Sequence, residues 1–270
     1  MPSIIYSVKD MAGYLIAEQL RRHHQFEPAD SEHRMWVGAG SDVQLIEIRE
    51  PLLEAEDLQV DSDYLIFASR HRSASGKASL TVHTTGNWGT KAEMGGRPSE
   101  VCYPQPSAMK HALLALAQQK FPGFEVAMEC THHGPTSLLP PSFFIELGSS
   151  EEQWRNQEAA KAVADAIMLA VKAEREKQHA QVAFGIGGGH YCPDFTKIEL
   201  ESEWAFSHVL PAYAIDEATD DVMMQAVEKG DPEIAILDCK GLKAPQREKA
   251  IAFAEKAGLE WVKDEDVKRA

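Results

Sequence analysis

One stretch, residues 123–149, most constrains what this chain can fold into. Two apolar runs, residues 124–128 and 143–147, flank the sequence Glu-Cys-Thr-His-His-Gly-Pro at residues 129–135. Short apolar runs bounded by Gly and Pro are typical of buried strands. In an α/β domain, polar residues that directly follow a buried strand lie at the edge of the sheet, where ligands bind. The stretch therefore predicts an α/β fold with a functional site after residue 128.

Strand patterns and helix patterns alternate along the rest of the chain. Apolar or alternating runs predict strands at residues 3–8, 43–48, 63–68, 80–85, 182–186, 204–210 and 234–237. Helical spacing and end signals predict helices at residues 11–20, 106–120, 149–177 and 246–256. We therefore expect a single α/β domain over residues 1–270, with a mixed, largely parallel sheet flanked by helices.

Composition narrows the class of protein. With 270 residues, of which 44% are apolar and 26% charged, the chain can bury a sizeable core. No apolar stretch approaches the roughly 20 residues of a membrane span, and no leader pattern opens the chain, so a cytoplasmic location is expected. The four cysteines make no CxxC pair, which argues against a disulfide framework or a zinc ribbon. Nothing demands more than a monomer.

The formal charge of −15 argues against a generic nucleic-acid binder, although it leaves room for a local basic patch. Two basic clusters are candidates for phosphate contacts. Arg70, His71 and Arg72 form a loop after a predicted strand, and Lys240 and Lys243 belong to the densest basic cluster near the C-terminus. Arginine suits bidentate phosphate contact. The alternative for both clusters is a solvated surface that balances acidic neighbours.

The adjacent histidines His132 and His133 are the first candidates for chemistry. Neighbouring residues of a strand point to opposite faces, so Glu129 and His133 share one face and Cys130 and His132 the other. We therefore expect one histidine to face the pocket, unless the following Gly-Pro turn rotates the second. Neutral imidazole suits metal ligation and general base chemistry. The structural alternative is a hydrogen-bonded pair at a strand end.

A glycine-rich loop at residues 185–190 directly follows a short predicted strand. Glycine lets the backbone turn its N–H groups toward a phosphate, a carboxylate or a developing oxyanion. The loop is not a dinucleotide fingerprint, because His190 stands where the third glycine belongs and Pro193 is expected to block an early helix. It is not a P-loop either, since no Gly-Lys-Ser/Thr follows. Tight packing of a glycine loop is the structural alternative.

His83 lies within an apolar alternation, where a satisfied core histidine is the simpler interpretation. The sequence also lacks the GxSxG, HExxH and SxxK motifs and any cysteine protease signature. These absences disfavour a serine or thiol nucleophile and favour attack by water, aided by histidine or a metal. The residue pattern alone indicates an α/β hydrolase or transferase with histidine-rich loops.

Several motifs, taken together in their order along the chain, indicate a protein family more specifically than any single motif does. They are Glu-Cys-Thr-His-His-Gly-Pro-Thr at 129–136, Ser-Phe-Phe-Ile-Glu-Leu-Gly-Ser at 142–149, Ser-Arg-His at 69–71, Leu-Thr-Val-His at 80–83, Phe-Gly-Ile-Gly-Gly-Gly-His-Tyr at 184–191 and Asp-Cys-Lys-Gly-Leu at 238–242. Together they make the chain resemble the archaeal and plant type of D-aminoacyl-tRNA deacylase over nearly its whole length.

The resemblance implies an activity and a fold. Members of this family hydrolyse the ester between a D-amino acid and tRNA, which removes chirally wrong charges before translation. The implied fold is a phosphorylase/hydrolase-like α/β domain similar to peptidyl-tRNA hydrolase, the implied cofactor is zinc, and the implied source is archaeal. Two alternatives remain: a nucleoside phosphorylase-like enzyme that binds phosphate with the glycine loop and Arg70, and a zinc- and tRNA-binding module without catalysis.

The resemblance, combined with the residue types, yields a set of expected roles. His133 or His132 activates water or holds zinc, with Glu129 or Glu146 as a second ligand or an orienting carboxylate. The expected metal ligands are His83, His133 and His190. The expected substrate contacts are Gly187, Gly188, Gly189, Arg70, His71, Arg72, Lys240 and Lys243.

Overall fold

Two sheets carry the fold of this protein. The structure is a computed structural model that describes residues 1–32, 34–40 and 42–267. Within these residues, eight strands form one sheet in the order β2-β3-β4-β1-β5-β10-β6-β9, and four form another in the order β12-β11-β13-β14. The first sheet consists of β1 (Ser3–Ser7), β2 (Phe26–Pro28), β3 (Met35–Gly38), β4 (Gln44–Ile48), β5 (Leu65–Arg70), β6 (Ser79–His83), β9 (Glu125–Met128) and β10 (Ser142–Gly148). The second consists of β11 (Gln181–Ile186), β12 (Trp204–Leu210), β13 (Ile234–Leu237) and β14 (Glu260–Lys263).

Strand direction confirms the predicted fold class. Strands β4, β1, β5 and β10 run parallel, β6 is antiparallel to β10, and β9 is parallel to β6. The second sheet is parallel throughout. The chain is thus an α/β fold with a mixed, largely parallel sheet flanked by helices, as expected. Its division into two sheets was not predicted, because strand patterns do not say which strands pair.

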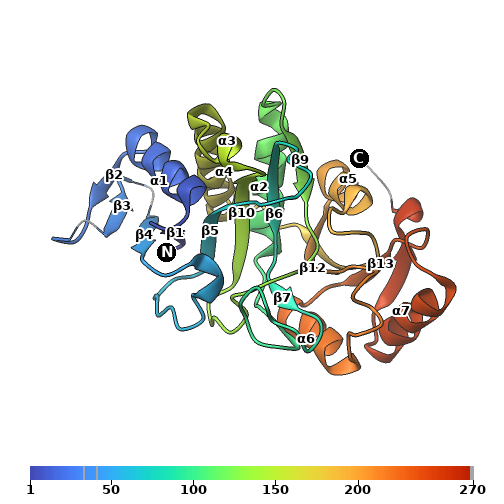
Figure 1. Ribbon diagram of the computed structural model, residues 1–270. Coiled ribbons are helices and arrows are strands. Elements are labelled where there is room, and N and C mark those ends of the chain that lie inside the picture. Colours follow the sequence, from blue (N-terminus) through green and yellow to red (C-terminus); the bar gives the residue numbers. More distant parts are fainter. Residues whose placement is uncertain (33, 41, 268–270) are drawn as a thin grey trace.

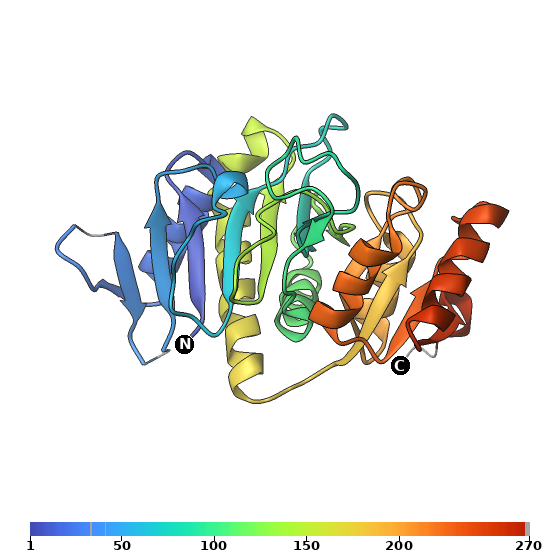
Figure 2. The same cartoon turned by 90° about the horizontal axis from the view of Figure 1, so that it is seen from below.

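Helices cover both sheets. On the first sheet lie α1 (Met11–His23), α2 (Pro106–Gln119), the single turn α3 (Glu151–Trp154) and α4 (Gln157–Arg175); around the second lie α5 (Pro193–Glu201), α6 (Asp220–Gly230) and α7 (Ala244–Lys256). Figures 1 and 2 show the β2–β3 hairpin and α7 at opposite ends of the molecule. Short elements complete the fold: the ribbon β7 (Gly86–Asn87) with β8 (Glu100–Val101), and the 3-10 turns Leu52–Glu54 and Asp264–Asp266.

Two predictions about helices were wrong. The helix expected over residues 149–177 is two helices, because the Asn156 side chain accepts a hydrogen bond from the Ala159 N–H and starts α4 anew. Pro193 does not block a helix but opens α5 at its first position, where the missing N–H costs nothing and the fixed φ fits. Among the described residues, no helix is both long and apolar enough to cross a membrane.

Alternation along β10 separates the core from the open face of the first sheet. Ile145 and its neighbours two positions away are buried in the core cluster beneath the helices. Phe144 and Glu146 point to the other face, where Phe144 packs in a smaller cluster. Strand β6 pairs Thr81 with Glu146 and His83 with Phe144, so these side chains share that face. The polar side chains of the central strands therefore converge away from the helices.

The central position of β10 predicts a large stability effect. Ile145 is 0% exposed, so Ile145→Ala removes buried methyl groups and leaves a cavity. We expect a loss of about 2–5 kcal/mol in the free energy of unfolding. Leu169→Ala, at a side chain 49% exposed on α4, is the control and should change it by less than about 0.5 kcal/mol. Urea unfolding measures both, and equal effects would contradict this account of the core.

Candidate active site

Four strands of the first sheet bring polar side chains to one region. His83 is the last residue of β6, Glu129 directly follows β9, and His71 directly follows β5. Glu146 projects from β10, next to β6. Because β6 and β9 run parallel, their carboxyl ends lie at the same edge. All four side chains are buried.

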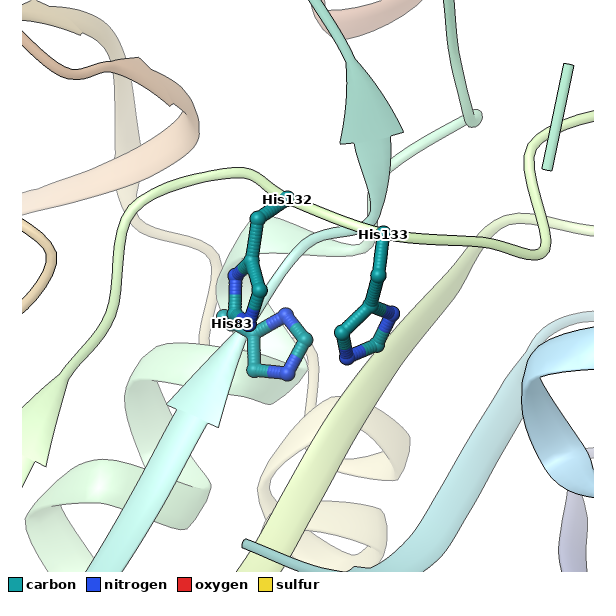
Figure 3. A group of neighbouring side chains, drawn as sticks. All are labelled: His83, His132 and His133. Atoms are coloured by element: carbon teal, nitrogen blue, oxygen red, sulfur yellow. The ribbon is translucent and has the colours of Figure 1, made fainter. Parts of the chain in front are cut away.

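Three histidines form the centre of this region. His83, His132 and His133 each offer a ring nitrogen, and these atoms lie within 4.8 Å of one another. The ring centroids are 4.3 Å apart for His83 and His132 and 4.4 Å apart for His132 and His133. Figure 3 shows the three rings side by side, His83 at the end of β6 and the other two on the adjacent loop. We call these three residues the histidine triad.

The adjacent histidines His132 and His133 both line the cavity, which is the case that we expect only if a turn rotates the second histidine. The strand alternation does not apply, because β9 ends at Met128. His132 makes an isolated bridge with Thr85, and His133 has a left-handed φ of 43°. This turn, directly before Gly134, brings both rings to the same side.

His71 links the two buried carboxylates. Its Nδ1 is 3.1 Å from Glu129 Oε1 and 3.3 Å from Glu146 Oε2, while its Nε2 is 2.6 Å from the Tyr191 hydroxyl. Burial alone would lower the pKa of His71, but the contacts with the two carboxylates raise that pKa to about 11. His71 is therefore an imidazolium at neutral pH, and its charge offsets part of the repulsion between the two glutamates.

His190 joins the cluster from the glycine-rich loop. Its Nε2 lies 2.8 Å from Glu129 Oε2, and contacts with Cys130 and Glu129 raise the pKa of His190 to about 10. The backbone N–H of Cys130 donates to the His190 carbonyl at 2.9 Å, which fixes the loop against residue 129. The Cys130 thiol also lies 3.2 Å from the hydroxyl of Tyr213. His190 is 40% exposed and is the charged histidine that reaches solvent.

The carboxylates and the triad have opposite protonation tendencies. Burial opposes ionisation of Glu129 and Glu146, yet hydrogen bonds from His190 and His71 hold the pKa of Glu129 well below its usual range. Contacts with His71 and His83 hold the pKa of Glu146 at about 2. Burial and the neighbouring imidazoles lower the pKa of His133 to about 4 and that of His132 well below its usual range. At neutral pH the glutamates are therefore ionised, and these two triad members are neutral.

A cavity of about 480 Å³ opens onto this cluster. His71, His190, Glu146 and two triad members line it together with the basic residues Arg70, Arg72 and Lys9. Arg70 is partly exposed, lies 3.9 Å from Asp10 and stacks over the Trp154 ring. The volume is in the range of small-molecule sites, and the basic residues stand at its rim.

Other predicted site residues lie elsewhere. The Gly187 N–H donates to the Leu210 carbonyl at 2.9 Å, so it does not point at a ligand, and Gly187, Gly188 and Gly189 do not line the histidine cavity. Gly187 instead has φ 121° and lies against Asp238, where a side chain would be crowded. Lys240 forms an exposed ion pair with Glu265 at 2.8 Å, and neither Lys240 nor Lys243 lines the cavity.

The structure adds residues that our sequence analysis missed. Asp10 lines the cavity and accepts hydrogen bonds from the backbone N–H groups of Gly13 and Arg70. Its position between a predicted strand and a predicted helix was a usable signal, because helix caps and strand ends coincide there. Tyr191 and Tyr213 contact His71 and Cys130 through their hydroxyls. No local pattern marks these tyrosines, since their partners are distant in sequence.

The triad has the chemistry of a metal-binding site. His83 is 0% exposed and its Nε2 makes no hydrogen bond to any residue that the structure describes, which is rare for a buried ring nitrogen. Three clustered imidazoles with neighbouring carboxylates suit zinc. A second group of possible zinc ligands consists of Cys130, His132 and His190, whose ligand atoms lie within 4.8 Å of one another. The two groups share His132, so the residues present fit zinc at either of two overlapping sites.

The raised pKa of His71 predicts a pH-dependent contribution to stability. A histidine with a pKa of about 11 when folded and about 6.5 when unfolded stabilises fully below pH 6.5, and this contribution falls as pH rises toward 11. We expect the stability difference between metal-free wild type and His71→Asn to shrink steadily from pH 6 to pH 9. Urea unfolding at several pH values measures it. A difference that stays constant would show that His71 is not charged in the folded protein.

Sequence and structure comparisons agree on one family. A model of the family described as D-aminoacyl-tRNA deacylase matches residues 58–262. The chain is 36% identical to the D-aminoacyl-tRNA deacylase of Archaeoglobus fulgidus, over 100% of this chain and 98% of that one, and 45% identical to that of Pyrococcus furiosus, over 76% and 75%. The crystal structure of a conserved protein of unknown function superposes with a TM-score of 0.91 at 36% identity, covering 99% of this chain and 96% of that one. The chain therefore belongs to the D-aminoacyl-tRNA deacylase family.

Proposed function

We propose that this protein hydrolyses the ester bond of D-aminoacyl-tRNA and releases the free D-amino acid and tRNA. One observation carries the proposal, in a chain of the D-aminoacyl-tRNA deacylase family. A cavity lined by His132, His133, Glu146 and the charged His71 and His190 lies against the buried His83 and Glu129 of the same cluster. Aminoacyl-tRNA is made and used in the cytoplasm, which is the proposed place of action.

The cluster contains a proton acceptor and a proton donor in direct contact. Ester hydrolysis needs a group that takes a proton from water and a group that gives one to the leaving ribose oxygen. Glu129 is ionised and lies 3.7 Å from His132 at the triad, and His190 is charged and lies 2.8 Å from Glu129. We assign the acceptor role to Glu129 Oε2 and the donor role to His190 Nε2.

These roles account for the proton that is transferred from water to the leaving oxygen, while the second water proton stays on the product carboxyl group and is released to solvent. The water oxygen bonds to the ester carbon, and the water proton moves to Glu129. The carbonyl oxygen then carries negative charge, which the nearby His71 imidazolium stabilises. When the C–O bond to the ribose breaks, His190 protonates the leaving oxygen. Glu129 returns its proton to His190 across their 2.8 Å contact, which restores the starting state.

The histidine triad is the proposed zinc site. Low pKa values make His132 and His133 poor proton acceptors at neutral pH but keep their nitrogen lone pairs free for a metal. Glu129 and Glu146 each lie 3.7 Å from a triad nitrogen and would orient the rings. When bound, zinc would polarise the ester carbonyl and acidify water.

Arg70 and Arg72 are the proposed contacts for tRNA phosphates. Both line the cavity, and the Arg72 side chain is exposed. Phosphate contacts position a nucleic acid, and they depend on the charge of one face rather than on the net charge of −15. Lys240 and Lys243 remain candidates for more distant phosphates, because they lie between β13 and α7, away from the cavity.

The role of Glu129 predicts a specific loss of activity. Glu129→Gln keeps the side-chain shape but cannot accept the proton, so kcat on D-aminoacyl-tRNA should fall by about 10²–10⁴. Glu18→Gln, at an exposed position on α1, should match wild type. Release of labelled amino acid from D- and L-aminoacyl-tRNA measures this. Wild-type turnover by Glu129→Gln would remove Glu129 from the proton transfer, and no release from the D-substrate by wild type would contradict the proposed function.

The two overlapping groups of possible zinc ligands predict different metal contents in variants. Protein dialysed after zinc loading should keep about one zinc per chain. His83→Ala and His133→Ala should lose it, whereas His190→Ala should retain zinc while losing activity. His179→Ala, at an exposed histidine, is the control and should retain both. Elemental analysis gives the answer independently of turnover. Retention of zinc by His83→Ala with its loss in His190→Ala would place the metal at Cys130, His132 and His190 instead.

A further inference from the structure

A second cavity, of about 520 Å³, lies between the free edge of β9 and helix α5. Its walls are largely apolar and include Val126, Ala127, Pro193 and Leu200. Lys77 and Lys197 stand at its rim, with Glu125 and Glu201 also present, so the rim carries both charges. A volume of this size accommodates a nucleoside, and the apolar walls suit the faces of a flat base.

The edge of β9 offers backbone groups to this cavity. The Glu125 N–H donates to Ala78, directly before β6, and the Glu129 N–H donates to Val82 of β6. The Met128 N–H instead donates to the Thr196 hydroxyl on the α5 side, and the Met128 carbonyl accepts there from the Cys192 N–H. Because alternate residues of a strand present their backbone groups to the same side, the N–H and C=O of Val126 also face α5. An N–H and a C=O side by side match the acceptor and donor on the edge of adenine.

A buried hydroxyl group adds to this site. Ser79 lines the cavity and is 4% exposed, and its Oγ makes no hydrogen bond to any described residue. Thr81, two positions along β6, is fully buried and likewise lacks a described partner for its Oγ1. Buried hydroxyls without partners are uncommon. The Ser79 hydroxyl therefore indicates a ligand with a polar group, whereas the apolar walls alone would indicate only an apolar one.

The same row of buried side chains extends from this cavity toward the active site. Ser79, Thr81 and His83 share one face of β6, and the first and last are about 13 Å apart along the strand. Tyr191 lines the cavity, and its hydroxyl oxygen accepts a hydrogen bond from Nε2–H of the charged His71 at 2.6 Å. An ester held at the histidine triad is joined through one ribose to the terminal base of the tRNA. The separation therefore fits the two ends of one aminoacyl-adenosine.

We propose that the cavity between β9 and α5 binds the terminal adenosine of the tRNA, with the base against Val126 and the ribose toward Tyr191. The proposal rests on the proposed function for the identity of the ligand. It assigns Tyr191 as a positioning residue, because the phenol contacts both the cavity and His71. The catalytic groups then act on the ester, while this second cavity fixes where the ester lies.

Adenosine 5′-monophosphate tests the proposal without turnover. Wild type should bind it, and ribose 5-phosphate, which lacks the base, should bind at least about tenfold more weakly. Leu200→Trp fills the cavity and should weaken nucleotide binding at least about tenfold and raise KM for D-aminoacyl-tRNA. Leu169→Trp, which makes the same change at an exposed position on α4, should leave both unchanged. Calorimetric titration measures the affinities, and thermal melting confirms that each variant is folded.

A labelling experiment does not depend on any variant. Photo-crosslinking of wild type with 8-azidoadenosine 5′-monophosphate should label peptides that contain residues 125–127 or 191–201. Labelling confined to other segments overturns the proposal, as does equal nucleotide affinity in wild type and folded Leu200→Trp. Because binding is read without hydrolysis, nucleotide binding at this cavity without deacylation would contradict only the proposed function. Deacylation without nucleotide binding there would contradict only this inference.

Discussion

Two buried carboxylates that share one imidazolium set the conditions for the rest of the site. Glu129 and Glu146 are almost completely buried, and two negative charges so placed repel each other and lose hydration. His71 lies within 3.3 Å of an oxygen from each, and Tyr191 holds the other side of its ring. The positive charge of His71 helps to keep both glutamates ionised, and Glu129 is held ionised by His190 as well.

The same pair of carboxylates divides the histidines into two kinds. His71 and His190 contact carboxylate oxygens directly and remain charged. His132 and His133 are crowded by other imidazoles in a buried place, so they remain neutral. Charged histidines can donate protons and stabilise an oxyanion, and neutral ones can bind a metal. A single buried cluster thus contains both kinds of group that an ester hydrolase requires.

The two sheets meet at this cluster. Residues 129–133 leave β9 and pass between them: Thr131 exchanges hydrogen bonds with Val209 of β12, and Glu129 forms an isolated bridge with Tyr191. The first sheet supplies His71, His83 and Glu146, whereas the loop after β11 supplies His190 and Tyr191. The proton donor and acceptor of the proposed reaction therefore come from different sheets, and their contact depends on how the sheets pack.

The sequence by itself determined the fold class, most helices and strands, and the importance of the residues around His133, because apolar periodicity and Gly-Pro breaks act locally. It also marked Glu129, Glu146 and His190 as candidates. Only the tertiary structure decided that His132 and His133 face the same side, that the glycine N–H of residue 187 is bonded within the protein, and that Tyr191 supports His71. These outcomes arise from backbone turns and from contacts between residues that are distant in sequence, and burial and neighbouring charges then set the charge of each group.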